Sequence, residues 1–207
     1  MENKYVVAIG SSAGGLSAMK TFFDNTPHDQ ATYVILRHLP VDYKSQLQEI
    51  LQRHSKLRIL EAADNTLIEK DTVYIPPASA YMTITRDRLF LKPRKIISVA
   101  PNWSVNIFLQ SLANSKGNKS IAIILSGAGS DGAKGVTSIK NAGGMVIAQN
   151  LQSCEFRSMP YHAIKTGMVD YQLAPSEMPH FVLQHIASIL KPANLVKNLK
   201  KISTAED

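Results

Sequence analysis

The sequence predicts an α/β fold: a doubly wound, mostly parallel sheet with helices on both faces and an antiparallel hairpin insertion. Short runs of aliphatic and β-branched residues alternate with longer segments of helical periodicity along most of the chain. Such alternation is typical of strand–helix–strand units around a parallel sheet. It is interrupted between residues 71 and 91, where short β-rich runs follow one another with only turn residues between them.

The first third of the chain supplies strands and helices in alternation. We expect strands at residues 6–9, 33–36 and 58–60. A glycine-rich turn and a helix through about Phe23 follow the first strand. A helix from about Tyr43 to His54 follows the second, since Leu47, Ile50 and Leu51 fall on one stripe.

The interrupted region is expected to form the antiparallel insertion. Its predicted short strands are residues 71–77, 82–85 and 88–91.

Alternation then resumes to the end of the domain. Strands are expected at residues 121–125, 145–148 and 169–171, and helices at about 104–113, 132–141, from Met159 onward, and 176–190. We predict one domain over residues 1–191 and a basic tail or linker over residues 192–207.

Composition limits the classes of function. The single cysteine excludes an internal disulfide and fits a reducing compartment. No signal peptide and no membrane-spanning stretch is visible, so we expect a cytoplasmic protein without membrane insertion. The net charge of +7 fits extra surface lysines, an acidic protein partner or nucleic acid. No nucleic-acid-binding motif accompanies that charge, and we expect no nucleic-acid partner.

Three chemically distinctive residues follow predicted strands. In open α/β sheets, ligands bind beyond the carboxyl ends of the strands. Ser12 follows the first strand, His38 the second, and Asp131 the strand at 121–125. Each has a simpler explanation alone: a phosphate-binding turn, a packed histidine and a helix N-cap. Their placement at one sheet edge favours a Ser–His–Asp hydrolytic triad with Ser12 as nucleophile.

Other candidates for chemistry are weaker. Cys154 lies in a polar loop without a motif that would orient a histidine toward it. The remaining histidines lack metal-ligand spacing. We therefore expect neither a metal nor a cofactor.

Several motifs occur together in a characteristic order. They are residues 9–15 (IGSSAGG), 37–40 (RHLP), 74–77 (YIPP), 125–133 (LSGAGSDGA), 148–150 (AQN) and 159–160 (MP). On these motifs the chain resembles the catalytic domain of the chemoreceptor protein-glutamate methylesterases, the CheB family. The Ser-Ala-Gly-Gly-Leu variant, Phe22-Phe23 and residues 106–109 look most like the branch fused to a receptor methyltransferase.

The resemblance implies a serine hydrolase that acts on glutamate methyl esters of chemoreceptors in chemotaxis adaptation and can also deamidate receptor glutamines. It implies the roles of nucleophile for Ser12, base for His38 and orienting acid for Asp131. Backbone N–H groups at Ala13 and Ala128 are the oxyanion-hole candidates. The implied partners are cytoplasmic chemoreceptor helices and a methyltransferase domain in the same or another chain.

The chain also departs from the family pattern. Many members carry Thr at the position of Ala13, Met at that of Ala128 and Asp at that of Asn150. The catalytic pattern begins at Tyr5, so we expect no phosphoacceptor receiver domain ahead of it. The alternative function is a non-catalytic chemoreceptor-binding module with the same fold.

Overall fold

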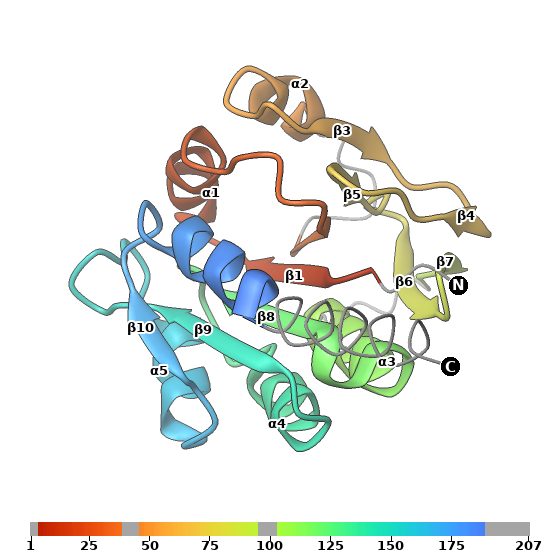
Figure 1. The fold of residues 1–207 in the computed structure, drawn as a ribbon. Helices are drawn as coiled ribbons and strands as arrows, with labels where there is room; N and C mark the ends of the chain where they lie inside the picture. Colours follow the sequence, from red (N-terminus) through yellow and green to blue (C-terminus); the bar gives the residue numbers. More distant parts are fainter. Residues whose placement is uncertain (1–3, 39–45, 95–102, 189–207) are drawn as a thin grey trace, which may run out of the picture.

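The main sheet contains seven parallel strands. The computed structural model describes residues 4–38, 46–94 and 103–188. The strand order is β10-β9-β8-β1-β2-β5-β3 (Figure 1). The strands are β1 (Val6–Ser11), β2 (Thr32–Arg37), β3 (Arg58–Glu61), β5 (Thr72–Ile75), β8 (Ser120–Ile124), β9 (Met145–Gln149) and β10 (Tyr171–Leu173).

The central strands are buried throughout. Every residue of β1, β8 and β9 is buried, and most are Val, Ile or Ala. Continuous apolar strands of this kind fit a parallel sheet that is covered on both faces.

Helices cover both faces of this sheet (Figure 1). One core contains Val7 and Ile9 of β1, and the other contains Val6 and Ala8, as expected for alternating side chains. The first face carries α1 (Gly15–Asp24), α2 (Leu47–Gln52) and a helix over residues 178–188. The second carries α3 (Ser104–Lys116), α4 (Ala133–Asn141) and α5 (Ser158–Lys165), with a short 3₁₀ turn, η1 (Gly117–Lys119), after α3.

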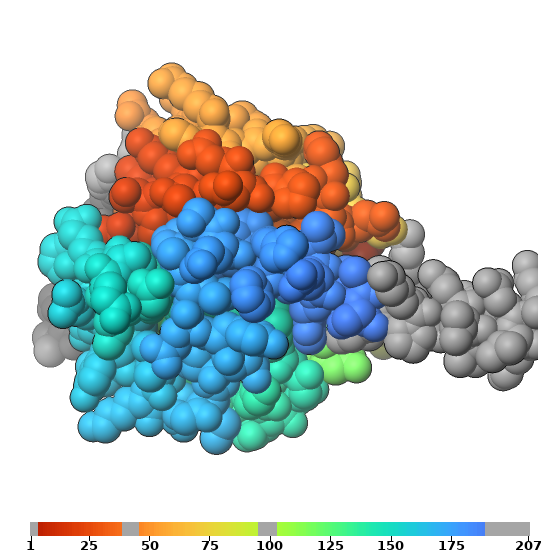
Figure 2. All heavy atoms as spheres, turned by 60° about the vertical axis from the view of Figure 1, so that its left-hand side comes forward, coloured from red at the N-terminus to blue at the C-terminus, as the bar shows by residue number. Residues whose placement is uncertain are grey.

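Figure 2 shows the 178–188 helix (blue) beside the segment that carries α1 (red). Met178 and Val182 share a buried cluster with Met19 and Phe22 of α1. The predicted start of α2 at Tyr43, the predicted helix end at Leu190 and the predicted tail all lie outside the described residues. In the part of the chain that the structure describes, no helix combines the length and apolarity that crossing a membrane requires.

The fold class is confirmed, but one predicted strand is placed differently. The run at 71–77 was expected in the antiparallel insertion; its strand, β5, instead pairs in parallel with β2 and β3. All four of its residues are buried. Val73 packs into one core and Tyr74 into the other, so β5 is covered on both faces like an interior strand.

The rest of the insertion is a small antiparallel sheet of order β4-β7-β6. Strands β6 (Ala80–Thr85) and β7 (Arg88–Pro93) form the expected hairpin, and β4 (Thr66–Leu67) adds a strand that the sequence did not indicate. Met82, Ile84 and Leu89 attach this sheet to the core under α3.

The strand order reverses between β1 and β8. From β1 the chain builds outward through β2, and from β8 it builds the other way through β9 to β10. Ligands of doubly wound sheets bind at such a reversal, beyond the carboxyl ends of the strands. The loops that follow β1 and β8 carry Ser12 and Asp131.

Candidate active site

Ser12 lies in a tight turn between β1 and α1. Its backbone N–H donates to the carbonyl of Ser126, at 3.1 Å, in the loop after β8. Its carbonyl accepts from Gly15 N, also at 3.1 Å. The Ser12 side chain remains partly exposed at the sheet edge. The turn is therefore fixed to the β8 loop through its backbone.

Close packing explains the glycines around Ser12. A Cβ at Gly10 would lie 2.6 Å from Val105 Cγ1, and one at Gly15 would lie 2.6 Å from Ser11 Cβ. Gly14 has a φ of 69°, a left-handed conformation that glycine adopts without steric cost. These glycines bring β1, α1 and α3 close together.

His38, which is partly buried, pairs with the buried Asp131. His38 Nε2 lies 2.8 Å from Asp131 Oδ2, and the two side chains are 20% and 2% exposed. Because a carboxylate only accepts hydrogen bonds, Nε2 carries the hydrogen in this pair. Nδ1 is then the ring nitrogen that can accept a proton.

The Asp131 carboxylate is held by backbone donors as well. Oδ2 also accepts from Val105 N at 2.9 Å, and Oδ1 accepts from the N–H groups of Asn106 and Gly132, each at 2.9 Å. Val105 and Asn106 belong to the first turn of α3, whose N-terminus favours a negative charge. The sequence allowed Asp131 to be the N-cap of the following helix; that position belongs to Gly132.

Ser12 and His38 follow paired residues on neighbouring strands. Ser11 of β1 is in register with Arg37 of β2, so Ser12 and His38 leave the sheet side by side. Within the described ranges, the Ser12 hydroxyl makes no hydrogen bond with His38 or any other residue. The structure thus joins His38 to Asp131 directly, and Ser12 follows the strand next to that of His38 without a hydrogen bond to either residue.

Two backbone donors near Ser12 are unoccupied. Among the described residues, neither Ala13 N nor Ala128 N has a hydrogen-bond acceptor. Ser12 N is engaged by Ser126, and Gly127 N donates to Phe156 O at 3.0 Å. The N–H groups of Gly14, Gly129, Ser130 and Asp131 likewise have no acceptor among the described residues, so Ala13 N and Ala128 N are two of several donors in these turns that are free to bind a ligand oxygen.

Gln149 supports the β8 loop, a role that the sequence did not indicate. Its Oε1 accepts from Ser126 N at 2.8 Å, and its Nε2 donates to Ser153 O at 2.9 Å. The side chain is buried at the end of an otherwise apolar strand. In the sequence, the signal that could have indicated this role is a polar residue at the carboxyl end of a buried strand.

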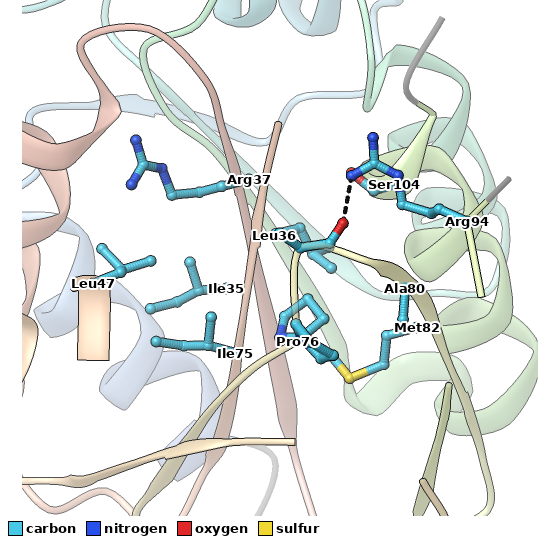
Figure 3. Close-up of a pocket in the computed structure, with 12 residues that line it drawn as sticks. Ile35, Leu36, Arg37, Leu47, Ile75, Pro76, Ala80, Met82, Arg94 and Ser104 are labelled. Carbon is cyan, nitrogen blue, oxygen red and sulfur yellow. Dashed lines mark hydrogen bonds between the residues drawn. The ribbon is translucent and has the colours of Figure 1, made fainter. Parts of the chain in front are cut away.

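A small cavity of about 20 Å³ lies beside the site, at the ends of β2 and β5 (Figure 3). In Figure 3 the Arg37 side chain points away from the other labelled residues, whereas the Arg94 side chain reaches inward and its guanidinium lies near Leu36. Arg94 Nη1 donates to Ala78 O at 2.8 Å, and its guanidinium lies 5.6 Å from the centre of the Tyr81 ring. A space of this size holds about one water molecule, and neither Ser12 nor His38 lines it.

The weaker candidates do not gather at the site. Burial raises the pKa of the Cys154 thiol, which keeps it protonated and poorly nucleophilic. Nowhere in the described ranges do three His, Cys, Asp or Glu residues come together as a group that could hold a metal ion.

Comparison with known proteins gives a consistent result. The family model for CheB methylesterase matches residues 7–182. A protein-glutamate methylesterase/protein-glutamine glutaminase of Methanosarcina mazei is 32% identical over 84% of this chain and 49% of its own length. One of Caulobacter vibrioides is 31% identical over 86% of this chain and 53% of its own length. The chain therefore spans about half the length of the curated relatives it matches.

A solved structure extends this similarity to the fold. The crystal structure of the Thermotoga maritima CheB methylesterase catalytic domain superposes with a TM-score of 0.80 at 29% sequence identity. The match covers 88% of this chain and 99% of that one.

Proposed function

Because this chain belongs to the CheB methylesterase family, we propose that it removes methyl groups from glutamate methyl esters of bacterial chemoreceptors. Ser12 is the nucleophile, His38 the general base and Asp131 the orienting acid. The observation that carries the proposal is the partly buried His38–Asp131 pair at 2.8 Å, whose histidine follows the strand that neighbours the strand before Ser12, close to the reversal of strand order. That arrangement supplies the parts of a serine hydrolase in one place.

The first step is attack of Ser12 Oγ on the ester carbonyl carbon. His38 Nδ1 takes the hydroxyl proton as the new C–O bond forms. The Asp131 carboxylate, which accepts from Nε2, fixes the ring and stabilises the imidazolium. Catalytic hydrogen bonds often tighten only when substrate binds, so the open Ser12–His38 geometry suits a free enzyme.

The oxyanion of the tetrahedral intermediate needs backbone donors. Ala13 N and Ala128 N fit this role because neither has an acceptor among the described residues. Each such donor is typically worth about 10²–10³ in rate.

Collapse of the intermediate breaks the bond to the methoxy oxygen. The proton on His38 transfers to that oxygen, methanol leaves, and Ser12 carries the glutamyl group as an ester. Water, deprotonated by His38, then attacks this ester and releases the glutamate side chain and Ser12. A receptor glutamine reacts by the same route with ammonia as the leaving group, and neither route requires a metal or cofactor.

The substrate segment would be a cytoplasmic chemoreceptor helix. Its methylation region is rich in carboxylates, and the net charge of +7 on this chain favours encounter with an acidic partner. A methyltransferase domain in the same or another chain remains a prediction.

The Ser12→Ala variant tests the assignment. It should abolish methanol release from methylated receptor while its circular dichroism spectrum stays that of the parent. Ser17→Ala, at an exposed serine of α1, is the matched control and should keep full activity. Methanol release by Ser12→Ala at the parent rate would contradict the proposal. Receptor binding without methanol release by the parent chain would instead support the non-catalytic module.

A further inference from the structure

We propose that Asn106 is a positioning residue for Asp131, and through Asp131 for His38. The inference rests on the proposed function, and it assigns a role to a side chain that does not itself touch His38 among the described contacts. Asn106 is partly buried in the first turn of α3.

Asn106 and the Asp131–Gly132 segment are tied together in both directions. The backbone N–H of Asn106 donates to Asp131 Oδ1 at 2.9 Å. In return, Asn106 Oδ1 accepts from Gly132 N at 3.1 Å and from Gly135 N at 2.8 Å. The backbone of Asn106 thus holds the Asp131 carboxylate, and the side chain of Asn106 holds the backbone that follows Asp131.

This exchange serves two helix ends at once. Neither Trp103 nor Gly132, the N-cap residues of α3 and α4, supplies a side-chain hydrogen bond to its own helix. Asp131 is the acceptor for Val105 N and Asn106 N of α3, and Asn106 is the acceptor for Gly135 N of α4. Because Asp131 accepts from Val105 N and Asn106 N, a shift of its carboxylate leaves backbone donors of α3 unpaired.

The surrounding packing leaves little room for adjustment. A Cβ at Gly132 would lie 2.8 Å from Ile124 Cδ1, and one at Gly135 would lie 2.6 Å from Leu109 Cβ. Helices α3 and α4 therefore approach closely at the level of Asp131. The hydrogen bonds of Asn106 set the position of the carboxylate within this tight contact.

An amide at position 106 caps α4 without adding charge. An aspartate there could accept the same two hydrogen bonds but would bring a second negative charge close to Asp131. A nearby negative charge favours the protonated form of an imidazole. Asn106→Asp therefore separates the two effects: capping is retained, and the electrostatic environment of His38 changes.

The other charged groups around His38 are the same in the parent chain and in Asn106→Asp. Asp131 is its ion-pair partner, Arg37 precedes it on β2, and Arg37 and Arg94 line the neighbouring cavity. None of them is altered by a substitution at position 106.

The matched control is Asn114, an exposed residue on the same helix. It lies eight residues further along α3, about 12 Å down the helix axis. Over that distance an added surface charge is largely screened at ordinary salt.

The experiment uses the full chain with substitutions Asn106→Asp, Asn106→Leu and Asn114→Asp. NMR titration of the His38 ring, assigned with a His38→Gln variant, measures the pH midpoint of its protonation without any need for turnover. Asn106→Asp should raise this midpoint by about 0.5 pH unit or more, with little change for Asn114→Asp. The acidic limb of the pH profile of kcat/KM should move by the same amount.

Asn106→Leu removes the acceptor at similar volume. It should lower kcat by about 10-fold or more with KM nearly unchanged, since small misplacements of catalytic groups are costly. Asn106→Asp should retain most of kcat at its own pH optimum.

Two outcomes would overturn the inference. One is a His38 midpoint that moves no more in Asn106→Asp than in Asn114→Asp. The other is an unchanged kcat in Asn106→Leu, if that variant folds. The NMR result stands whether or not Ser12→Ala loses activity, so failure of the inference and failure of the proposed function are distinguishable.

Discussion

The Asp131 carboxylate is the most extensively hydrogen-bonded group of the candidate site. Each of its oxygens accepts two hydrogen bonds, three in total from backbone N–H groups and one from His38. Such a carboxylate is held in one orientation, and among the described residues His38 is the only side chain that donates to it. At the scale of single residues, the site therefore depends on one buried acceptor that fixes the ring of its histidine.

Asp131→Asn should lower kcat for methanol release by about 10²–10⁴. An amide offers one oxygen in place of two, and its NH₂ group cannot accept from His38 or the backbone. The measurement is initial-rate kinetics on methylated receptor.

The control for this prediction is Asp24→Asn. Asp24 pairs with His54 at 2.9 Å on the surface, where such a pair contributes little. Activity of Asp131→Asn within a factor of two of Asp24→Asn would argue against an orienting role.

At the scale of elements, the helix over residues 178–188 closes the face of the sheet that carries α1. His185 on this helix packs edge-on against Tyr5, with ring centres 6.3 Å apart. Burial lowers the pKa of His185, and the Asp170 and Lys140 charges act on it in opposite directions. The helix is therefore packed with His185 in its neutral form.

Lowering the pH should weaken this helix contact. The unfolded chain takes up a proton at His185 near the ordinary value of 6.5, whereas the folded chain takes it up only at lower pH. The contribution to stability is therefore fully present above pH 6.5 and is lost as the pH falls below it.

Urea unfolding between pH 7.5 and pH 5.5 measures the effect, and a His185→Gln variant should show a flatter dependence of its free energy of unfolding on pH. His28→Gln, at an exposed histidine, is the control and should keep the parent slope. Identical slopes for the parent and His185→Gln would refute the prediction.

At the scale of the whole molecule, the net charge of +7 should govern encounter with an acidic receptor segment. Raising the salt concentration from 50 to 500 mM, a range of about tenfold, should raise KM for methylated receptor and leave kcat nearly constant, because screening weakens long-range attraction. A small neutral methyl ester is the control substrate, and its KM should not respond to salt. If KM responded to salt equally for both substrates, net charge would not contribute to recognition of the receptor.

Much of this molecule could be predicted from local patterns. Buried strands such as β1 and β8 are apolar runs, and helices such as α3 and α4 carry a 3.6-residue stripe, so both are visible within a short window of sequence. Because the carboxyl ends of parallel strands share one edge, the sequence alone predicts that Ser12, His38 and Asp131 lie at the same edge of the sheet.

Other features depend on which segments pack together. The direction of β5 is set by its pairing with β2 and β3, segments that lie far from it in the sequence, and a short apolar run is compatible with either direction. The sequence also allowed Asp131 to be the N-cap of the helix that follows it, whereas its carboxylate binds the first turn of α3, 25 residues away. Local sequence determined which residues form strands, helices and the polar turns; only the tertiary structure decided their partners, because hydrogen bonds and core contacts between distant segments have no local signature.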